Sequence, residues 1–307
     1  MSDEPANSSV LIIAGATASG KTELAMELAR RFDAEIVGAD SRQVYRGMPI
    51  GTAAPSGEQM ASVRHHLIGF VDPHERYSAA RYANDALDAL AEIRRRGKRA
   101  IVTGGTGFYL RALVGGVTLA PVYDEGLRAR LAREAALHSP EFLHEWLTTR
   151  DPVRARDLGA NDTYRVVRAL EIALAPPAAT LRAGAARTLA TEGFTWLLVF
   201  VDLPWREIDR RIELRTEAML QAGLVEEAER IGSGAVAANA VGYPAALAYL
   251  RGWSSRDELR RQLNRATRRY ARRQRAWFRS EPATMWVDPG DVAGAARETL
   301  GWDTKRE

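Results

Sequence analysis

The chain has 307 residues, of which 46% are hydrophobic and 27% charged, and its formal net charge is +4. This length is enough to bury a full core in one large domain, or in a large domain that carries a smaller one. The absence of cysteine excludes disulfides, thiolate zinc sites and a cysteine nucleophile, and it suits a reducing compartment.

The N-terminal segment lacks the features of a secretion signal. It carries Asp3 and Glu4 where a signal peptide has basic residues, and the apolar run after it is short. No apolar run reaches the roughly 18 residues typical of a membrane span. We therefore expect a soluble monomer of the cytoplasm.

The first motif is a glycine-rich turn between an apolar run and a helical segment. Residues 10–22 read VLIIAGATASGKT and fit the P-loop pattern of glycine, four residues, glycine, lysine and serine or threonine. The turn consists of Gly15, Ala16, Thr17, Ala18, Ser19, Gly20, Lys21 and Thr22. Its backbone N–H groups, the Lys21 charge and the positive end of the next helix favour phosphate, and the Thr22 hydroxyl suits Mg²⁺. The pattern predicts a site for the phosphates of a nucleotide or of another diphosphate.

Helices and strands then alternate along the chain. The expected elements are a helix over Gly20–Arg31, a strand over Glu35–Ala39, a loop with a helical turn over Asp40–Thr52, a strand led by residues 65–68, a helix over Ser78–Arg96 with Ser78 as N-cap, and a strand over Arg99–Thr103. This order predicts βαβ units and a parallel sheet with its ligand crevice at the carboxyl ends of the strands.

The middle of the chain has a different pattern. Between about Pro121 and Arg187 the strand signals stop, and the segment is rich in Ala, Leu, Arg and Glu. Helical runs are expected near Glu125–Leu137, Pro140–Thr149 and Asn161–Leu174, before an Ala-, Pro- and Arg-rich linker over residues 173–187. We interpret the segment as a helical insertion.

The remainder returns to the first pattern. A strand is expected over Thr195–Val201, long helices up to Arg279, and a last strand over Thr284–Val287. The predicted fold is α/β, a P-loop NTPase-like parallel sheet flanked by helices with an α-helical insertion domain. Its parts are a first core segment (8–120), the insertion (121–190) and a return to the core with basic helices (191–303).

Three features near the predicted crevice have two interpretations each. Asp40 ends the second strand and is a general base or an indirect Mg²⁺ partner, or else a cap for the turn at Ser41. The turn Gly104–Tyr109 is a second phosphate nest, or is glycine-rich for steric reasons. Arg215 is a planar clamp on a diphosphate, or an exposed helix salt bridge.

The adjacent histidines 65 and 66 invite a metal interpretation. Neighbouring side chains on a strand point to opposite faces, so one site using both is disfavoured. We predict packing and hydrogen bonding for them, and no metal.

A basic helix is predicted near the C-terminus. Between Arg251 and Arg279 there are eleven arginines and two acidic residues. Six arginines recur at spacings of four and three, namely Arg261, Arg265, Arg268, Arg272, Arg275 and Arg279. Apolar residues lie on the opposite face, namely Leu259, Leu263, Ala266, Tyr270 and Trp277. One face should pack on the protein while the other presents a row of guanidinium groups to a nucleic acid.

Seven segments in order carry a family resemblance. They are GATASGKT (15–22), DSRQVYRGMPIGT (40–52), HHLI (65–68), GGTGFY (104–109), NDTYRVVRALE (161–171), GYPAALAYLRG (242–252) and TRRYARRQRAWF (267–278). With them the chain resembles the tRNA dimethylallyltransferases, or tRNA isopentenyltransferases, over nearly all of Val10–Trp286. No zinc-finger extension follows Trp286, which is similar to the shorter bacterial type. Ala16, Ala54 and Ala276 depart from the family pattern.

The resemblance implies a reaction and its participants. The P-loop would hold the diphosphate of dimethylallyl diphosphate rather than ATP, Mg²⁺ would neutralise the leaving group, and the allyl group would pass to N6 of adenosine 37, beside the anticodon of tRNA. Asp40 would be the base, with Thr106 and Arg215 at the diphosphate. Because the target base is stacked, it would have to be flipped into the site.

The resemblance also implies contacts with tRNA. Gln43 would meet the adenine, and arginines of the insertion would touch the RNA. The implied set is Asp40, Ser41, Arg42, Gln43, Thr106, Arg128, Arg165, Arg168, Arg268 and Arg272, the last two on the basic helix.

Three other functions use some of the same features. A nucleotide or small-molecule kinase would pair the P-loop with ATP and use Asp40 on a hydroxyl acceptor. An adenylate isopentenyltransferase would prenylate free AMP or ATP. A non-enzymatic RNA-binding protein would use the basic helix alone. The arginine row and the helical insertion argue against the first two, and Asp40 beside an intact P-loop argues against the third.

Overall fold

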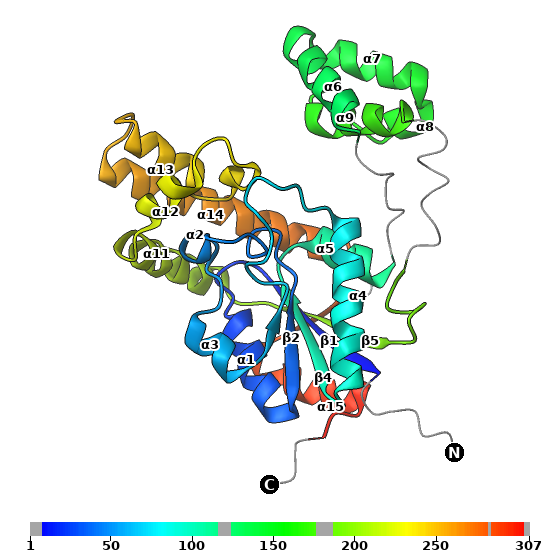
Figure 1. Ribbon diagram of the computed structural model, residues 1–307, viewed down its shortest axis with the longest axis vertical. Coiled ribbons are helices and arrows are strands. Elements are labelled where there is room, and N and C mark those ends of the chain that lie inside the picture. Colours follow the sequence, from blue (N-terminus) through cyan, green and yellow to red (C-terminus); the bar gives the residue numbers. More distant parts are fainter. Residues whose placement is uncertain (1–7, 116–123, 176–186, 282–283, 304–307) are drawn as a thin grey trace. The chain divides into compact units, whose positions relative to one another are not determined.

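The computed structural model describes residues 8–115, 124–175, 187–281 and 284–303 (Figure 1). The chain folds as two compact units. Residues 1–117 and 187–307 form the first, and residues 118–186 form the second. The predicted insertion, residues 121–190, extends a few residues beyond the end of this second unit. Leu189 belongs to the first unit, where it is fully buried and its N–H donates to Leu113 O over 2.9 Å. Residues 176–186 of the predicted linker lie outside the described part of the chain.

A parallel sheet organises the first unit. Its strands are β1 (Ser9–Gly15), β2 (Ala34–Gly38), β3 (His65–His66), β4 (Arg99–Gly104), β5 (Thr195–Val201) and β6 (Met285–Val287). Their order is β3-β2-β4-β1-β5-β6, and every pair is parallel. β1 is buried along its whole length, as its apolar sequence requires. The predicted class, a parallel α/β sheet flanked by helices, is confirmed.

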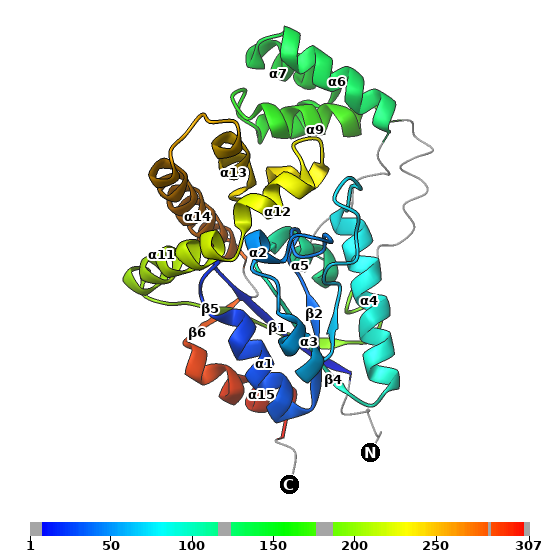
Figure 2. The same ribbon diagram turned by 60° about the vertical axis from the view of Figure 1, so that its left-hand side comes forward.

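Helices cover both faces of this sheet (Figures 1 and 2). On one face α1 (Lys21–Phe32) and α15 (Val292–Leu300) enclose a core that contains Leu11, Phe32 and the fully buried Trp302. On the other lie α4 (Ala79–Arg95) and α5 (Gly107–Val114), which pack on each other. Ser78 caps α4 as predicted, its hydroxyl accepting from Arg81 N.

A helical layer stands beyond the carboxyl ends of the strands (Figure 2). It comprises α2 (Pro49–Thr52), α11 (Trp205–Gln221), α12 (Leu224–Ile231), α13 (Tyr243–Leu250) and α14 (Arg256–Arg279), with a short 3₁₀ turn at Val236–Asn239. Outside this layer, α3 (Gly57–Ser62) leads into β3, and a second 3₁₀ turn (Pro289–Asp291) leads into α15. α11 and α13 both pack on α14. A second core, with Met48, Tyr243 and Leu259 among its buried residues, holds this layer to the loop that follows β2.

The second unit is a set of short helices with its own core. They are α6 (Glu125–Leu137), α7 (Pro140–Arg150), α8 (Pro152–Arg156) and α9 (Thr163–Ala173). Asp124, Ser139, Asp151 and Asp162 cap their N-termini by accepting from backbone N–H groups. Leucines that recur at helical spacing, such as Leu131, Leu143 and Leu170, are buried against one another. Each helix and strand predicted with bounds begins and ends within two residues of the observed one. The strand expected from residues 65–68 comprises only His65 and His66.

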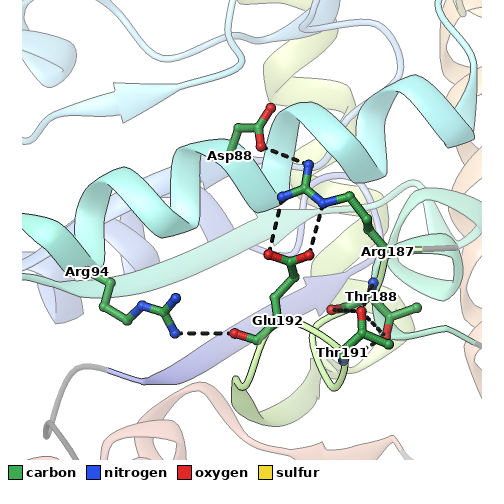
Figure 3. Close-up of polar contacts among 6 residues, drawn as sticks. All are labelled: Asp88, Arg94, Arg187, Thr188, Thr191 and Glu192. Carbon is green, nitrogen blue, oxygen red and sulfur yellow. Dashed lines mark hydrogen bonds and ion pairs between the residues drawn. The ribbon is translucent and has the colours of Figure 1, made fainter. Parts of the chain in front are cut away.

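Polar contacts hold the chain in place where it returns to the first unit (Figure 3). Arg187 donates to both carboxylate oxygens of Glu192, at 2.9 and 3.3 Å, and to Asp88 of α4 at 2.8 Å. The Arg187 guanidinium lowers the pKa of Glu192. Gly115, with φ +100°, ends α5 against Thr188, where a Cβ would lie 2.9 Å from the threonine methyl. The outgoing and returning chains therefore meet at one place.

None of the described helices is both long and apolar enough to cross a membrane.

Candidate active site

The first turn (residues 15–22) connects β1 to α1, the strand–turn–helix context that its sequence predicts. Ala18 and Gly20 have φ of 66° and 83°, which close the turn tightly. Gly15 is required because a Cβ there would lie 2.5 Å from the Ser19 hydroxyl. The turn is thus shaped by its own backbone, with N–H groups available at the N-terminus of α1.

Lys21 lies in this turn in a partly buried position. Its Nζ donates to Ala16 O over 3.4 Å. Burial lowers the pKa of Lys21 to about 8, against the opposing effect of the Asp40 carboxylate, while the Arg215 charge lowers it further. The site is therefore electropositive and poorly solvated, as an anion site should be.

Asp40 follows β2 at the same edge of the sheet. Its Oδ1 accepts from the N–H groups of Arg42 at 2.8 Å and Gln43 at 3.4 Å, so the predicted turn-cap interpretation is correct. Asp40 also lines the cavity that contains Thr17 and Arg215. The cap therefore fixes the carboxylate in the crevice, and its role as a base stays a prediction.

The second turn (residues 104–109) connects β4 to α5. Thr106 N–H donates to Ala39 O at 3.2 Å, and Thr106 Oγ1 accepts from Ser41 N at 2.9 Å. A Cβ at Gly104 would lie 2.1 Å from Ala39 O, so the steric reason for a glycine applies there. The second turn and the loop after β2 are thereby joined, with Thr106 beside Asp40.

Arg215 of α11 reaches the first turn. Its Nη1 donates to Thr17 Oγ1 over 3.2 Å, so the alternative of an exposed helix salt bridge is wrong. Burial lowers the pKa of Arg215, with Glu23 acting in the opposite direction. A desolvated, planar guanidinium beside a glycine-rich turn is suited to bidentate binding of a phosphate group.

Thr17, Asp40 and Arg215 line one cavity, the channel, of about 200 Å³, while Lys21 and Thr22 line a separate small cavity that also includes Asp40. The polar lining of the channel includes Thr17, Asp40, Ser41, Arg42 and Arg215. Its apolar lining includes Ile212, Met219, Leu224, Val241 and Leu263. A molecule with a charged end and a small hydrocarbon end matches this combination.

An open groove adjoins the channel. This arginine groove, of about 760 Å³, is lined by Arg265, Arg268, Arg269 and Arg272 of α14. It shares Asn239, Ala240 and Val241 with the channel lining, so the two spaces are adjacent. Arg265 pairs with Glu258 at 2.7 Å and Arg268 pairs with carboxylates of α11, whereas Arg269 and Arg272 are exposed, so these two give the groove a surface suited to phosphates.

The predicted row of exposed arginines on α14 needs a correction. Arg268 donates to Asp209 at 3.0 Å and to Glu213 at 2.5 Å, both on α11, and Arg275 donates to Asp202 at 2.6 Å. The prediction of a row of guanidinium groups open to a nucleic acid is therefore wrong at these positions. At Arg268 the reason is that α11 packs on α14, and at Arg275 the partner is the residue that follows β5. Arg272 is exposed, with its guanidinium 5.0 Å from the Trp205 ring.

The other predicted RNA contacts are divided between the two units. Gln43 Nε2 donates to Thr52 O at 3.1 Å and to Ala53 O at 3.0 Å, which fixes its side chain near the first turn. Arg128 lies on α6 and Arg165 and Arg168 on α9, all in the second unit. Arg165 pairs with Asp162 at 2.5 Å and Arg168 with the buried Glu171 at 2.7 Å. Their RNA contacts stay predictions.

The two histidines have separate partners. His66 Nε2 lies 2.7 Å from the buried Glu35, which also accepts two hydrogen bonds from Arg96. Burial would raise the pKa of Glu35, but the bonds from Arg96 and His66 outweigh it and lower that pKa. His65 Nδ1 lies 2.8 Å from Val63 O. Hydrogen bonding and packing, as predicted, are what the structure gives both rings.

Two buried residues that hold the site together were not predicted. Glu227 of α12, fully buried, accepts from Ile50 N at 2.9 Å, Gly51 N at 2.7 Å and Tyr243 Oη at 2.7 Å. Gln274 of α14 contacts both glycine-rich turns. Their partners are more than 150 residues away except for Tyr243, so no local pattern marks them.

Known proteins are similar to this chain in sequence and in fold. Residues 43–281 match the family described as IPP transferase. This chain belongs to that family. A tRNA dimethylallyltransferase of Anaeromyxobacter sp. (strain K) is 45% identical over 95% of this chain and 97% of its own, and one of Geobacter sulfurreducens is 42% identical over 91% of each. The full-length tRNA isopentenylpyrophosphate transferase of Bacillus halodurans has a similar structure, with 31% identity, a TM-score of 0.68 and 96% of each chain covered. The predicted resemblance is confirmed. The family match begins at residue 43, after the first turn, and includes the second turn.

Proposed function

We propose that this chain transfers the dimethylallyl group of dimethylallyl diphosphate to N6 of adenosine 37, next to the anticodon of tRNA, and releases diphosphate. Family membership and the names of its relatives support the reaction. The observation that carries the proposal is the channel, which combines a cationic end at Thr17 and Arg215 with an apolar wall and adjoins the arginine groove.

The diphosphate end of the donor would bind at the first turn. Backbone N–H groups at the start of α1, the Lys21 ammonium and the Arg215 guanidinium are the donors there. Charge grows on the bridging oxygen as the bond to the allyl carbon breaks, and preorganised donors stabilise it more than the ground state. The apolar wall with Ile212 and Met219 would receive the five-carbon group.

The acceptor supplies the electron pair. N6 of adenine attacks the first allyl carbon, the carbon–oxygen bond breaks, and its electron pair leaves with the diphosphate. N6 then has one proton too many, and Asp40, whose Oδ1 is held by the Arg42 N–H, takes it. Thr106, joined to Ser41, keeps the two turns in register at this point.

Mg²⁺ fits the oxygen groups beside Lys21. The Thr22 hydroxyl and the Asp40 carboxylate line the same small cavity, and oxygen is the ligand that Mg²⁺ prefers. Within the described residues no three His, Cys, Asp or Glu side chains cluster as a metal site, so donor phosphates and water would complete the coordination. When bound, Mg²⁺ would neutralise charge on the diphosphate.

The tRNA would lie on basic surface, with its target base extruded. Arg269 and Arg272 of the arginine groove would hold phosphates next to the channel. The flipped adenine would enter towards Asp40 and Gln43. Arg128, Arg165 and Arg168 would contact the same tRNA from the second unit.

Reactions with different donors and acceptors test the proposal. The protein is incubated with Mg²⁺, labelled dimethylallyl diphosphate and unmodified tRNA, and the tRNA is digested and analysed by mass spectrometry. We expect one added five-carbon unit on adenosine 37. Product with AMP alone would instead identify an adenylate isopentenyltransferase, and consumption of ATP with the allyl donor untouched would identify a kinase.

A further inference from the structure

Gln274 connects the two glycine-rich turns. It lies on α14 with 5% of its surface exposed. Its Oε1 accepts from Thr17 N over 2.8 Å, and its Nε2 donates to Gly105 O over 2.9 Å. A single buried amide thus satisfies one backbone group of each turn.

The second turn is shaped to admit this side chain. A Cβ at Gly105 would lie 2.0 Å from Gln274 Nε2, and a Cβ at Gly107 would lie 2.2 Å from the Trp277 ring. Both glycines therefore permit a close approach of α14 to the turn. Steric need and hydrogen bonding converge on the same contact.

Thr17 is consequently held from two sides. Its N–H donates to Gln274 and its Oγ1 accepts from Arg215. Thr17 lies near the start of the first turn, so the orientation of its peptide affects the rest of that turn. The remaining N–H groups of the turn are the proposed phosphate donors. A shift of a few tenths of an ångström in such donors weakens the binding of an anion that all of them must reach at once.

We propose that Gln274 is a positioning residue that holds the first turn in its diphosphate-binding conformation, acting through Thr17 and Gly105 without touching the substrate. This inference rests on the proposed function, in which that turn binds the diphosphate of the donor. Because Gln274 is on the same helix as the arginine groove, it also ties the turn to the element that would contact tRNA.

Three single variants and one double variant test the contact itself. Gln274→Ala removes both hydrogen bonds, and Gly105→Ala displaces the glutamine while keeping it in the chain. In the double variant the space of the glutamine is open, and the nearest other atom to the new Cβ is Gly15 O at 3.3 Å. Gln274→Met keeps the bulk of the side chain and removes its polar atoms. Gln221→Ala, at the exposed end of α11, is the matched control.

The measurement is titration calorimetry with magnesium diphosphate, together with KM for dimethylallyl diphosphate and Kd for tRNA. We expect Kd for diphosphate to rise about tenfold in each of the three single variants, as for the loss of one or two hydrogen bonds. The double variant should match Gln274→Ala rather than show the product of both effects. KM for the donor should rise with Kd, while kcat changes less and tRNA affinity stays within about twofold.

Unchanged diphosphate affinity in Gln274→Met, or independent effects in the double variant, would overturn the inference. A variant that is merely misfolded would lose tRNA affinity and thermal stability as well, and that outcome also counts against a positioning role. Failure of the proposed function is distinguishable, because then the unmodified protein would itself transfer no prenyl group.

Discussion

Arg215 Nη1 donates to Thr17 Oγ1 over 3.2 Å, so a helix from the second half of the chain reaches the glycine-rich turn near its start. The turn therefore has its cation in place before any ligand binds. Such a preorganised donor stabilises developing charge without reorganisation.

Replacing Arg215 should affect the chemical step more than tRNA binding. We expect Arg215→Ala to lower kcat/KM by about 10² to 10³, or about 3 kcal/mol, which is typical for one preorganised donor. Arg210→Ala, on the exposed side of the same helix and paired with Glu207, should have little effect. Equal losses in the two variants, measured in single-turnover assays, would remove Arg215 from this role.

The role of Asp40 can be tested against a control residue, Asp72, whose carboxylate has the same local geometry. Asp40→Asn keeps an oxygen for the Arg42 N–H but cannot take a proton, so turnover should fall by about 10² to 10⁴ with unchanged tRNA affinity. The control is Asp72→Asn, because Asp72 also accepts from the N–H two residues later, at 2.8 Å, but is exposed and outside the channel lining. Near-normal turnover of Asp40→Asn would refute the assignment.

The pKa of Lys21 predicts how diphosphate binding depends on pH. Burial lowers this pKa to about 8 in the free protein, and a bound anion would raise it. Below pH 8 Lys21 is charged before binding, and its attraction for the diphosphate is complete. As pH rises from 8 to the pKa of Lys21 in the bound state, this contribution to affinity is lost, and the protein takes up a proton when diphosphate binds. Calorimetry in two buffers of different ionisation enthalpy measures the uptake.

Lys21→Arg provides the comparison for this titration. Its guanidinium stays charged across the interval, so the excess proton uptake of the native protein should vanish. If both proteins take up the same number of protons above pH 8, the lysine is not the titrating group.

Much of the fold could be predicted, and the reason is visible in single elements. β1 and β5 are short apolar runs, and α4 has a serine cap and a clear apolar stripe, so their bounds follow from local pattern. The residues of the two turns were likewise found from glycine spacing. Gln274 and Glu227 could not be found in this way, since their roles depend on partners brought together only by folding.

Salt dependence should separate the arginines of α14. Arg272 is exposed, whereas Arg268 is already paired with Asp209 and Glu213. We expect Arg272→Ala to lower the slope of log Kd against log salt for tRNA by somewhat under one unit. Arg268→Ala should lower it less, because its charge is partly neutralised within the protein.

A distant arginine is the control for this series. Arg30 is exposed on α1 near its C-terminal end, away from the arginine groove, and Arg30→Ala should leave the slope unchanged. Salt-independent binding of tRNA, or equal slopes for Arg272→Ala and Arg30→Ala, would contradict the arginine groove as the phosphate contact.

Glu227 should matter for stability. Glu227→Ala leaves the N–H groups of Ile50 and Gly51 and the Tyr243 hydroxyl without their acceptor, at a cost of about 3 kcal/mol or more in the free energy of unfolding. Tyr243→Phe removes one of these bonds and should cost about 1 kcal/mol. Urea denaturation measures both, and a Glu227→Ala variant as stable as Tyr243→Phe would show that α2 does not depend on the carboxylate.

The meeting of Leu113 and Leu189 has a consequence for how this chain could have acquired its middle segment. Their backbone hydrogen bond closes a loop of chain that runs from Leu113 to Leu189. Because the ends of this loop are already adjacent, lengthening it changes only the entropy of loop closure. That penalty grows with the logarithm of length, and a sevenfold longer loop costs only about 2 kcal/mol more. The bonds of Arg187 to Asp88 and Glu192 lie at the same closure and are of a size to offset it. An ancestral sheet could therefore have accepted the helical segment without altering the pairing of β5 with β1.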